Sequence, residues 1–408
     1  MFFFPLTIIS FKKKWYLSNL RKSKFYRPFL NETLSFESLP IVNKKIFMQK
    51  FNDINTANIN IGEAQKIAYE SEKSRDFSPM INQVSVGFST GTSGNKSLFL
   101  VSENERAKWV AYILDRVVRI SLNVQKVAFF LRANNNLYES SNSKLLQFNF
   151  FDIFKSFSDH VSNLNDLKPD ILIAQPSVLK LLGESKKKGF LKINPKKIIS
   201  IAEVLTDEDK KYFEKIFSVK IDQVYQCAEG FLAHTCSEGK LHFNEDFLII
   251  EKNYVDEKKT KFHPIITDLS RNTQPIARYE LNDIITEDKK CKCGSKFLAI
   301  KNIEGRSDDT FKFLNDKQKE ILIFPDLLRR SVVMSDNKIE DYQIIQKSDV
   351  LISLYIKSKD KKSFELAKKS ISNCLENLNI NKIDIIQSNS LKFKIGDKKR
   401  RVINENRK

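Results

Sequence analysis

Apolar strand patterns alternate with helical patterns in the middle of this chain, and this alternation limits the fold more than any other feature. Apolar runs typical of buried strands occupy residues 126–131, 169–174, 197–202 and 219–225. Between them, residues 176–182 and 206–217 have helical apolar spacing, and each begins with Pro or Thr, as helices often do. Strands separated by helices predict parallel βαβ units, so we expect an α/β fold.

The pattern changes on both sides of this region. Helical spacing at residues 61–74 and a capping box at Ser102 and Glu105 predict helices before it. Hairpin-like strands dominate residues 241–285, and a smaller set of strands with one helix follows residue 306. We therefore predict a large domain at residues 1–305, made of βαβ sheets with a β-hairpin subdomain, and a small α+β domain at residues 306–408.

Charge, the apolar N-terminal residues and the cysteine count indicate which partners and which cellular location to expect. The net charge is +19, but the lysines are spread along the chain, and no zinc-finger repeat or arginine-rich tail occurs, so no nucleic-acid partner is expected. The apolar residues 1–9 are too few to span a bilayer and lack the features of a secretory signal. Five cysteines suit a reducing compartment, and the cytoplasm is the expected location.

A loop rich in glycine and hydroxyl residues follows the strand pattern of residues 84–88. Its backbone amides, hydroxyls and lysine could surround a polyphosphate. It lacks the Walker spacing, and from these residues alone a polar turn between a strand and a helix is an equal alternative. The residues concerned are Ser89, Thr90, Gly91, Thr92, Ser93, Gly94 and Lys96.

Three further motifs follow this loop in a fixed order. Residues 225–229 read Tyr-Gln-Cys-Ala-Glu, residues 267–283 contain Thr-Asp-Leu, Pro-Ile-Ala-Arg-Tyr and Asp283, and residues 304–312 read Glu-Gly-Arg-Ser-Asp-Asp-Thr-Phe-Lys. Near the end, residues 396–402 read Gly-Asp-Lys-Lys-Arg-Arg-Val. Over residues 40–403 the ordered set resembles the adenylate-forming superfamily, most closely its phenylacetate–CoA ligase branch and the related deazaflavin-adenylating (coenzyme F) synthetases. The resemblance implies their fold, in which the small C-terminal domain is mobile.

The resemblance also implies roles for individual residues. Glu229 would bind the Mg²⁺ that bridges the ATP phosphates, a task for a hard oxygen ligand. Tyr225, with Ala202 and Glu203 of a Gly-Ala-Glu-like turn, would line the adenine pocket. Asp283 would accept hydrogen bonds from both ribose hydroxyls. Each of these acids has a plainer alternative, which is a helix N-terminal acid for Glu229 and an exposed turn for Asp283.

Catalysis would fall to Thr92 of the loop, Arg306 and Lys398. Arg306 would approach the ribose and the α-phosphate, and Lys398 would reach the carboxylate and the α-phosphate during adenylation. Asp308 matches the hinge about which the small domain rotates. The alternative for Lys398 is a solvated basic tail.

The sequence departs from the family pattern at two positions. Ala228 replaces a hydroxyl residue that helps to hold the α-phosphate in the family. Asp397 stands where the family has glycine, which leaves Lys399 open as an alternative to Lys398.

A separate set of metal-ligand residues comprises Cys236, His242, Cys291 and Cys293. Three thiolates and one imidazole form a closed tetrahedral set for a structural Zn²⁺. Reduced buried thiols are the alternative.

The leading hypothesis is an ATP- and Mg²⁺-dependent ligase that adenylates a small carboxylic acid and passes the acyl group to CoA or another nucleophile. A second hypothesis changes the chemistry after ATP binding: the chain adenylylates a phenolic hydroxyl, or transfers the acyl group to an amine or sugar in envelope or natural-product biosynthesis. A third is a non-catalytic nucleotide-binding protein, favoured by Ala228 and Asp397. The oligomeric state is open, with a homodimer among the options.

Overall fold

The computed structural model describes most of the chain and divides it into two compact units. The large unit contains Met1–Asn253, Pro264–Leu281 and Glu287–Lys301, and the small unit contains Tyr254–His263, Asn282–Thr286 and Asn302–Lys408. The predicted domain boundary at residues 305 and 306 stays a prediction. The described residues are 6–30, 35–89, 97–118, 123–131, 146–153, 155–288, 291–315, 317–318, 320–336, 338–380, 383–392 and 400–406.

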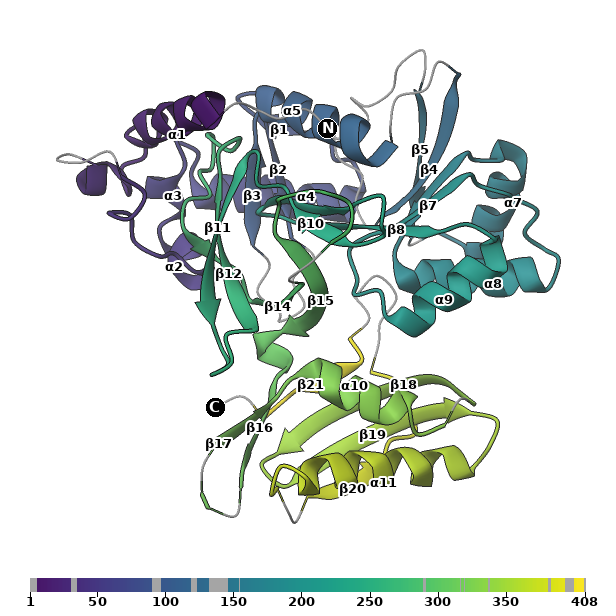
Figure 1. Ribbon diagram of the computed structural model, residues 1–408. Coiled ribbons are helices and arrows are strands. Elements are labelled where there is room, and N and C mark those ends of the chain that lie inside the picture. Colours follow the sequence, from purple (N-terminus) through teal and green to yellow (C-terminus); the bar gives the residue numbers. More distant parts are fainter. Residues whose placement is uncertain are drawn as a thin grey trace. The chain divides into compact units, whose positions relative to one another are not determined.

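A parallel sheet with helices forms one part of the large unit (Figure 1). The strands, in chain order, are β4 (Gln125–Leu131), β5 (Leu146–Asp152), β6 (Ile171–Ala174), β7 (Lys197–Ser200) and β8 (Ile221–Cys227). The helices are α7 (Phe157–Leu167), α8 (Pro176–Lys187) and α9 (Asp207–Phe217). Neighbouring strands pair in parallel in the order β5-β4-β6-β7-β8. The predicted βαβ units are therefore confirmed.

The helices bury their apolar faces against these strands. Phe130, Leu172, Leu179 and Phe213, from two strands and two helices, belong to one buried core. Thr206 caps α9 by accepting a hydrogen bond of 3.1 Å from the amide of Asp209, as the sequence predicted. Helix α7 was not predicted from the sequence.

The sheet changes from parallel to antiparallel at β8. The strands that follow are β9 (Gly230–Thr235), β10 (Leu241–Phe243), β11 (Leu248–Tyr254), β12 (Lys261–Asp268), β13 (Tyr279–Glu280), β14 (Asp283–Asp288) and β15 (Ala299–Arg306). They continue the same sheet in the order β8-β9-β10-β15-β14-β12-β11, while β13 pairs with β12. Because β8 and β9 are antiparallel and joined by a tight turn, residues 228–230 lie at one end of β8. This arrangement confirms the predicted hairpin region.

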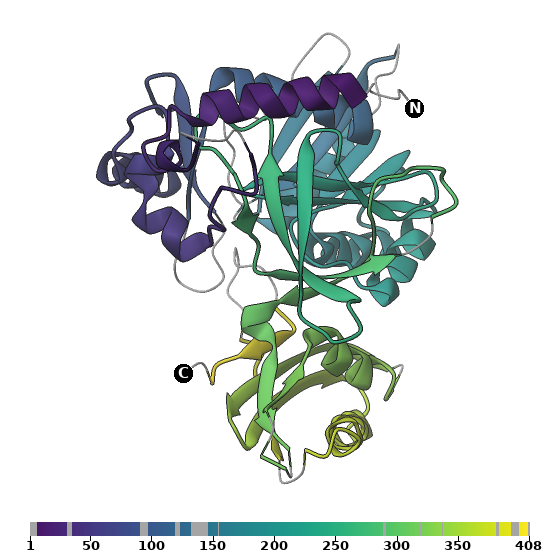
Figure 2. The same cartoon turned by 60° about the vertical axis from the view of Figure 1, so that its left-hand side comes forward.

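The N-terminal region of the large unit adds helices and a small antiparallel sheet. These elements are α1 (Leu6–Leu20), η1 (Arg27–Leu30), α2 (Lys44–Gln49), α3 (Phe51–Ile54), α4 (Ile61–Ser74), β1 (Met80–Ile81), β2 (Val84–Phe88), β3 (Leu98–Val101), α5 (Glu103–Ile113) and a π-helical turn η2 (Leu114–Val118). Figure 2 shows α1 as the long purple helix. The Tyr16 hydroxyl of α1 donates to the carbonyl of Ile276 at 3.0 Å, and Tyr26 donates to that of Ala277 at 3.2 Å. These bonds hold the N-terminal region to the Pro-Ile-Ala-Arg-Tyr segment.

Helix α5 begins with the predicted capping box of Ser102 and Glu105. Its α-helical part ends at Ile113, where the π turn η2 follows. Within the part of the chain that the structure describes, no helix combines the length and the apolar character needed to cross a bilayer.

The small unit has its own sheet and core. Its elements are η3 (Ser307–Asp309), β16 (Phe311–Leu314), β17 (Glu320–Ile323), α10 (Pro325–Val333), β18 (Ile339–Ser348), β19 (Leu351–Ser358), α11 (Lys362–Glu376), β20 (Asp384–Gln387) and β21 (Val402–Asn404). The main sheet has the order β20-β19-β18-β21, and Figures 1 and 2 show α10 and α11 on one of its faces. Ile344, Leu354 and Ile371 lie in the core between them. The predicted strands and the helix α11 are confirmed, whereas α10 was missed.

Candidate functional site

The glycine loop joins two antiparallel strands. β2 ends at Phe88 and β3 begins at Leu98, and these two residues are partners in the ladder. The amide of Ser89 donates to the carbonyl of Ser97 at 2.7 Å, and the amide of Ser97 donates to the Ser89 hydroxyl at 2.9 Å. The loop therefore connects two strands and not a strand and a helix, and its phosphate-binding role stays a prediction. Thr90, Gly91, Thr92, Ser93, Gly94 and Lys96 lie outside the described residues.

Glu229 lies in the two-residue turn between β8 and β9. Cys227 and Gly230 are ladder partners on either side of it. Its side chain is partly exposed, and no other described residue bonds to its carboxylate. The alternative of a helix N-terminal acid is wrong, because a strand follows. The Tyr225 ring is buried, with its centroid 6.4 Å from that of Phe243.

A buried polar segment after β12 fixes this turn relative to the glycine loop. Arg271 donates to the carbonyl of Ala228 at 3.3 Å and to that of Leu100 in β3 at 3.0 Å. Gln274 adds a bond of 2.9 Å from the amide of Leu100. The turn that carries Glu229 and the strand that follows the loop therefore share one anchor. The sequence motif included Thr267 and Asp268, but nothing in one sequence marked Arg271.

Asp268 supports the same turn. Its Oδ2 would lie 2.8 Å from a Cβ atom at position 230, so only glycine fits there without movement. Asp268 accepts hydrogen bonds from the amide and the hydroxyl of Ser270, at 2.8 and 2.5 Å. Burial raises the pKa of its carboxyl to about 6, against the lowering effects of Ser270 and Arg271. A largely desolvated acid thus packs against Gly230, the residue that follows Glu229.

Ala202 and Glu203 lie after β7, beside the N-terminus of α8. Ala202 has a φ of 65°, which is unfavourable for a residue with a Cβ atom. Glu203 accepts hydrogen bonds from the Ser177 hydroxyl at 2.9 Å and from its amide at 3.1 Å. Glu203 therefore caps a helix, whereas its adenine-binding role stays a prediction.

In the small unit, Asp283 and Arg306 lie close together. Asp283 begins β14 and Arg306 ends β15, and the Asp283 Oδ1 and Arg306 Nε atoms are 4.0 Å apart. Asp308 lies in the short 3-10 turn η3 that follows. The structure brings the predicted ribose ligand together with the predicted catalytic arginine, next to the predicted hinge. Asp397, Lys398 and Lys399 lie outside the described residues.

The cysteine and histidine side chains converge in the large unit. Cys236 follows β9, His242 lies in β10, and Cys291 and Cys293 lie between β14 and β15. Their ligand atoms all lie within 4.8 Å of one another. The Cys236 and Cys291 Sγ atoms are 3.7 Å apart, and Cys293 Sγ is 3.5 Å from His242 Nε2.

The separations of 3.7 and 3.5 Å fit a tetrahedral metal ion. Zn–S and Zn–N bonds of about 2.3 and 2.0 Å place tetrahedral ligands about 3.5 to 3.8 Å from one another. A disulfide would instead need an S–S distance of about 2.05 Å. Burial raises the pKa of the Cys291 thiol, but hydrogen bonding with the Cys293 backbone and with the side chains of the cluster outweighs it and lowers the pKa to about 7, whereas burial raises the pKa of the Cys293 thiol to about 11. Cys291 can therefore reach the thiolate form, which is the form that binds zinc, near neutral pH.

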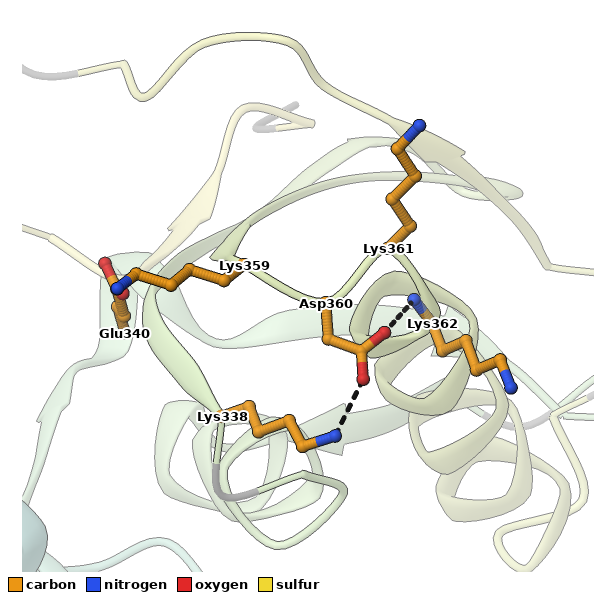
Figure 3. A pocket seen from close by; sticks show the side chains of 6 residues that line it. All are labelled: Lys338, Glu340, Lys359, Asp360, Lys361 and Lys362. Atoms are coloured by element: carbon orange, nitrogen blue, oxygen red, sulfur yellow. Dashed lines mark hydrogen bonds and ion pairs between the residues drawn. The ribbon is translucent and has the colours of Figure 1, made fainter.

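A surface pocket lies elsewhere, in the small unit (Figure 3). Its lining is mostly lysine, and Asp360 pairs with Lys338 at 2.7 Å. It contains none of the predicted site residues. The lining residues are Lys338, Glu340, Lys359, Asp360, Lys361 and Lys362.

Comparisons with known proteins find relatives by sequence and by structure. No protein-family model matches the chain. Protein CapK of Staphylococcus aureus is 22% identical over 363 residues, 83% of this chain and 77% of that protein. Indoleacetate–lysine synthetase of Pseudomonas savastanoi is 28% identical over 248 residues, 57% of this chain and 59% of that protein.

Solved structures show the fold. A 2-hydroxyisobutyryl-CoA ligase, in the postadenylation state with R3-HIB-AMP, matches 98% of this chain and 89% of its own with a TM-score of 0.69 and 15% identity. The predicted resemblance is therefore confirmed at the level of structure, and the chain has the fold of the adenylate-forming ligases.

Proposed function

We propose that this chain is an AMP-forming ligase that activates a small carboxylic acid with ATP. One observation carries the proposal: nearly the whole chain matches a ligase whose structure holds an acyl adenylate. The ordered motifs support it, because the described ones lie on the turns and strand ends around Glu229, Asp283 and Arg306. The acid itself is not specified by these residues.

The reaction proceeds in two balanced steps. A carboxylate oxygen of the acid attacks the α-phosphorus of ATP, the bond to the β-phosphate oxygen breaks, and pyrophosphate leaves. A nucleophile then attacks the acyl carbon, and AMP leaves with the bonding electron pair. The first step needs alignment and neutralisation of charge more than covalent help from the protein.

The residues divide this work. The glycine loop, with Lys96 and Thr92, would hold the phosphates that leave as pyrophosphate. Lys398 and Arg306 would neutralise charge on the α-phosphate, and Asp283 would hold the ribose. Ala202, Glu203 and Tyr225 would line the adenine site. Rotation at Asp308 would withdraw Lys398 before the second step, in keeping with hinges that use a few residues at the end of an element.

Mg²⁺ would be bound by Glu229. The carboxylate lies in a tight turn without a partner among the described residues, which leaves its oxygens available to a hard cation. The ion would neutralise charge on the phosphates. Arg271 and Asp268 keep the turn in place from behind.

A structural zinc ion fits the Cys236, His242, Cys291 and Cys293 cluster. Support comes from the tetrahedral spacing of the ligand atoms. Four protein ligands leave no open position for catalysis. The ion would hold the β9–β10 hairpin to the segment before β15.

The acceptor has two candidate classes. CoA is bound with 2-HIB-AMP in a further structure of the matched ligase, which supports thioester formation. An amine is favoured by the similarity to indoleacetate–lysine synthetase, whose name describes an amide product. The same first step serves both, so the adenylation claim does not depend on the choice.

Acid-dependent exchange between ATP and labelled pyrophosphate tests the first step. A panel of acetate, benzoate, phenylacetate, indole-3-acetate and 2-hydroxyisobutyrate would be offered to the purified native chain with MgATP. We expect at least one acid to support exchange. The products formed with CoA as the acceptor would then be compared with the products formed with lysine as the acceptor.

A further inference from the structure

Helix α1 carries apolar side chains on both of its faces. Tyr16, Leu17 and Leu20 are buried in the large unit. Phe11 and Trp15 are four residues apart, so they lie on one face of the helix, and they are 70% and 45% exposed. Figures 1 and 2 show α1 along the outside of the large unit. A surface helix normally turns polar side chains to the solvent, whereas the outer face of α1 places two aromatic rings there.

Lysine side chains flank the two rings. Residues 12–14 are three consecutive lysines between Phe11 and Trp15, and Lys14 is exposed. Lys108 of α5 is exposed as well, and its Nζ atom lies 5.6 Å from the centre of the Trp15 ring. This distance is within the range of a cation–π contact. The outer face of α1 therefore combines aromatic rings with positive charge that comes from two helices.

The surrounding sequence has the same charge bias. Residues 1–31 contain no acidic side chain, although the whole chain contains 50, and residues 2–9 carry no charge at all. The same stretch contains seven basic residues, which are Lys12, Lys13, Lys14, Arg21, Lys22, Lys24 and Arg27. An uncharged sequence followed by a basic one suits a partner that is both apolar and anionic.

An anionic phospholipid bilayer presents both properties. At its interface, Trp and Phe rings enter the boundary between headgroups and acyl chains, while lysine ammonium groups stay among the phosphates. Each lysine or arginine near an anionic membrane surface adds to the attraction. A nucleic acid would match the charge, but its phosphate backbone offers no apolar layer for Phe11. The side chains of this face therefore favour a lipid surface.

We propose that the outer face of α1 docks on the surface of an anionic phospholipid bilayer. Phe11 and Trp15 enter the interface, and Lys14 and Lys108 lie among the headgroups. Binding is peripheral and reversible, because two rings and a few lysines anchor a protein far more weakly than a spanning helix does. The docking surface does not depend on the proposed function, since none of the predicted ATP-site residues lies in α1 or α5.

Co-sedimentation of the purified native chain with lipid vesicles tests the docking surface. Vesicles of phosphatidylcholine would be compared with vesicles in which about a third of the lipid is phosphatidylglycerol, at physiological ionic strength. We expect the native chain to partition onto the anionic vesicles at least about ten-fold more strongly than onto the neutral ones. The ring variant, Phe11→Ser with Trp15→Ser, keeps every charge and should lower binding to the anionic vesicles at least about ten-fold.

Two matched controls separate this surface from general attraction. Tyr69 of α4 is 66% exposed, so Tyr69→Ser removes an exposed ring elsewhere in the large unit and should change binding by less than about two-fold. Lys14→Glu with Lys108→Glu should weaken binding at least about ten-fold. Lys187→Glu with Lys188→Glu makes the same change in net charge at the exposed end of α8, and should weaken binding by less than about three-fold.

Tryptophan fluorescence reports whether the rings enter the bilayer. The chain contains two tryptophans, so Trp109→Phe leaves Trp15 as the only one. With anionic vesicles, the emission of Trp15 should shift to shorter wavelength, and lipids with brominated acyl chains should quench it. This measurement keeps both rings of α1, so it still tests the proposal if thermal unfolding shows that the ring variant does not fold.

Several results would overturn the proposal. An unshifted Trp15 spectrum, or equal vesicle binding by the native chain and a folded ring variant, would show that the rings do not enter the bilayer. A native dimer that the ring variant converts to a monomer in sedimentation velocity, without vesicle binding, would assign the face to a second copy of the chain. Loss of affinity for single-stranded DNA rather than for vesicles in the ring variant would assign it to a nucleic acid.

Discussion

The Nδ1 atom of His242 lies 2.8 Å from the carbonyl oxygen of Phe297, and this contact fixes which imidazole nitrogen faces the cysteines. A carbonyl oxygen can only accept, so Nδ1 carries the hydrogen. Nε2, 3.5 Å from Cys293 Sγ, then has the free lone pair. Metal-bound histidines are commonly oriented in this way by a backbone carbonyl.

We expect the purified chain to contain about one zinc ion per molecule by elemental analysis. Cys293→Ser removes one thiolate, so it should lose most of the zinc and at least about 2 kcal/mol of the free energy of unfolding. Cys374→Ser is the control, because Cys374 lies in α11 outside the cluster. Equal zinc content in the two variants would contradict a metal centre at these residues.

The buried carboxyl of Asp268 should make stability depend on pH. Burial raises the pKa of this carboxyl from its ordinary value of 3.8 to about 6 in the folded chain, so the folded state binds the proton more tightly than the unfolded state does. The unfolding free energy contributed by this group therefore falls as pH rises from about 4 to about 6, by about 3 kcal/mol in total, and is constant above.

Asp268→Asn isolates this effect, because asparagine keeps an acceptor for Ser270 and does not ionise. Relative to the native chain, the variant should gain stability in urea denaturation as pH is raised from 4 to about 6, and the gain should level off by pH 7. A stability difference that is flat over this range would show that Asp268 does not titrate as described.

Glu203 should contribute to stability as a helix cap. Glu203→Gln removes the charge and one of the hydrogen-bond acceptors beside α8. The variant should therefore lose about 1 kcal/mol of the free energy of unfolding, measured by chemical denaturation. Glu208→Gln, an exposed acid in the first turn of α9, should change stability by less than about 0.5 kcal/mol. Matching stabilities for the two variants would rule out the cap. If KM for ATP rises in Glu203→Gln but not in Glu208→Gln, the result would also support the predicted contact of Glu203 with adenine.

Local sequence signals predicted the regular elements well. The apolar runs gave the parallel strands, and Thr206, Ser102 and Glu105 marked helix starts that the structure confirms. The π turn after Ile113 escaped prediction because its apolar spacing differs little from that of an α-helix. Helices α7 and α10 were missed, since their apolar residues were assigned to neighbouring strands or left unassigned.

The contacts behind the site could not be predicted in the same way. Arg271 reaches Ala228 and Leu100, which are 43 and 171 residues away. Such pairs depend on how strands far apart in sequence are brought together, and no spacing rule encodes them. The cysteine and histidine set was proposed from residue type and spacing, and only the fold shows that the four side chains meet.

The most direct test of adenylation is acid-dependent pyrophosphate exchange by the native chain beside Lys398→Ala and Lys96→Ala. The account predicts exchange in the native chain, a loss of at least about 100-fold in kcat for Lys398→Ala with an unchanged unfolding midpoint, and a raised KM for ATP in Lys96→Ala. Full exchange activity in both variants, or no exchange with any acid of the panel, would contradict it.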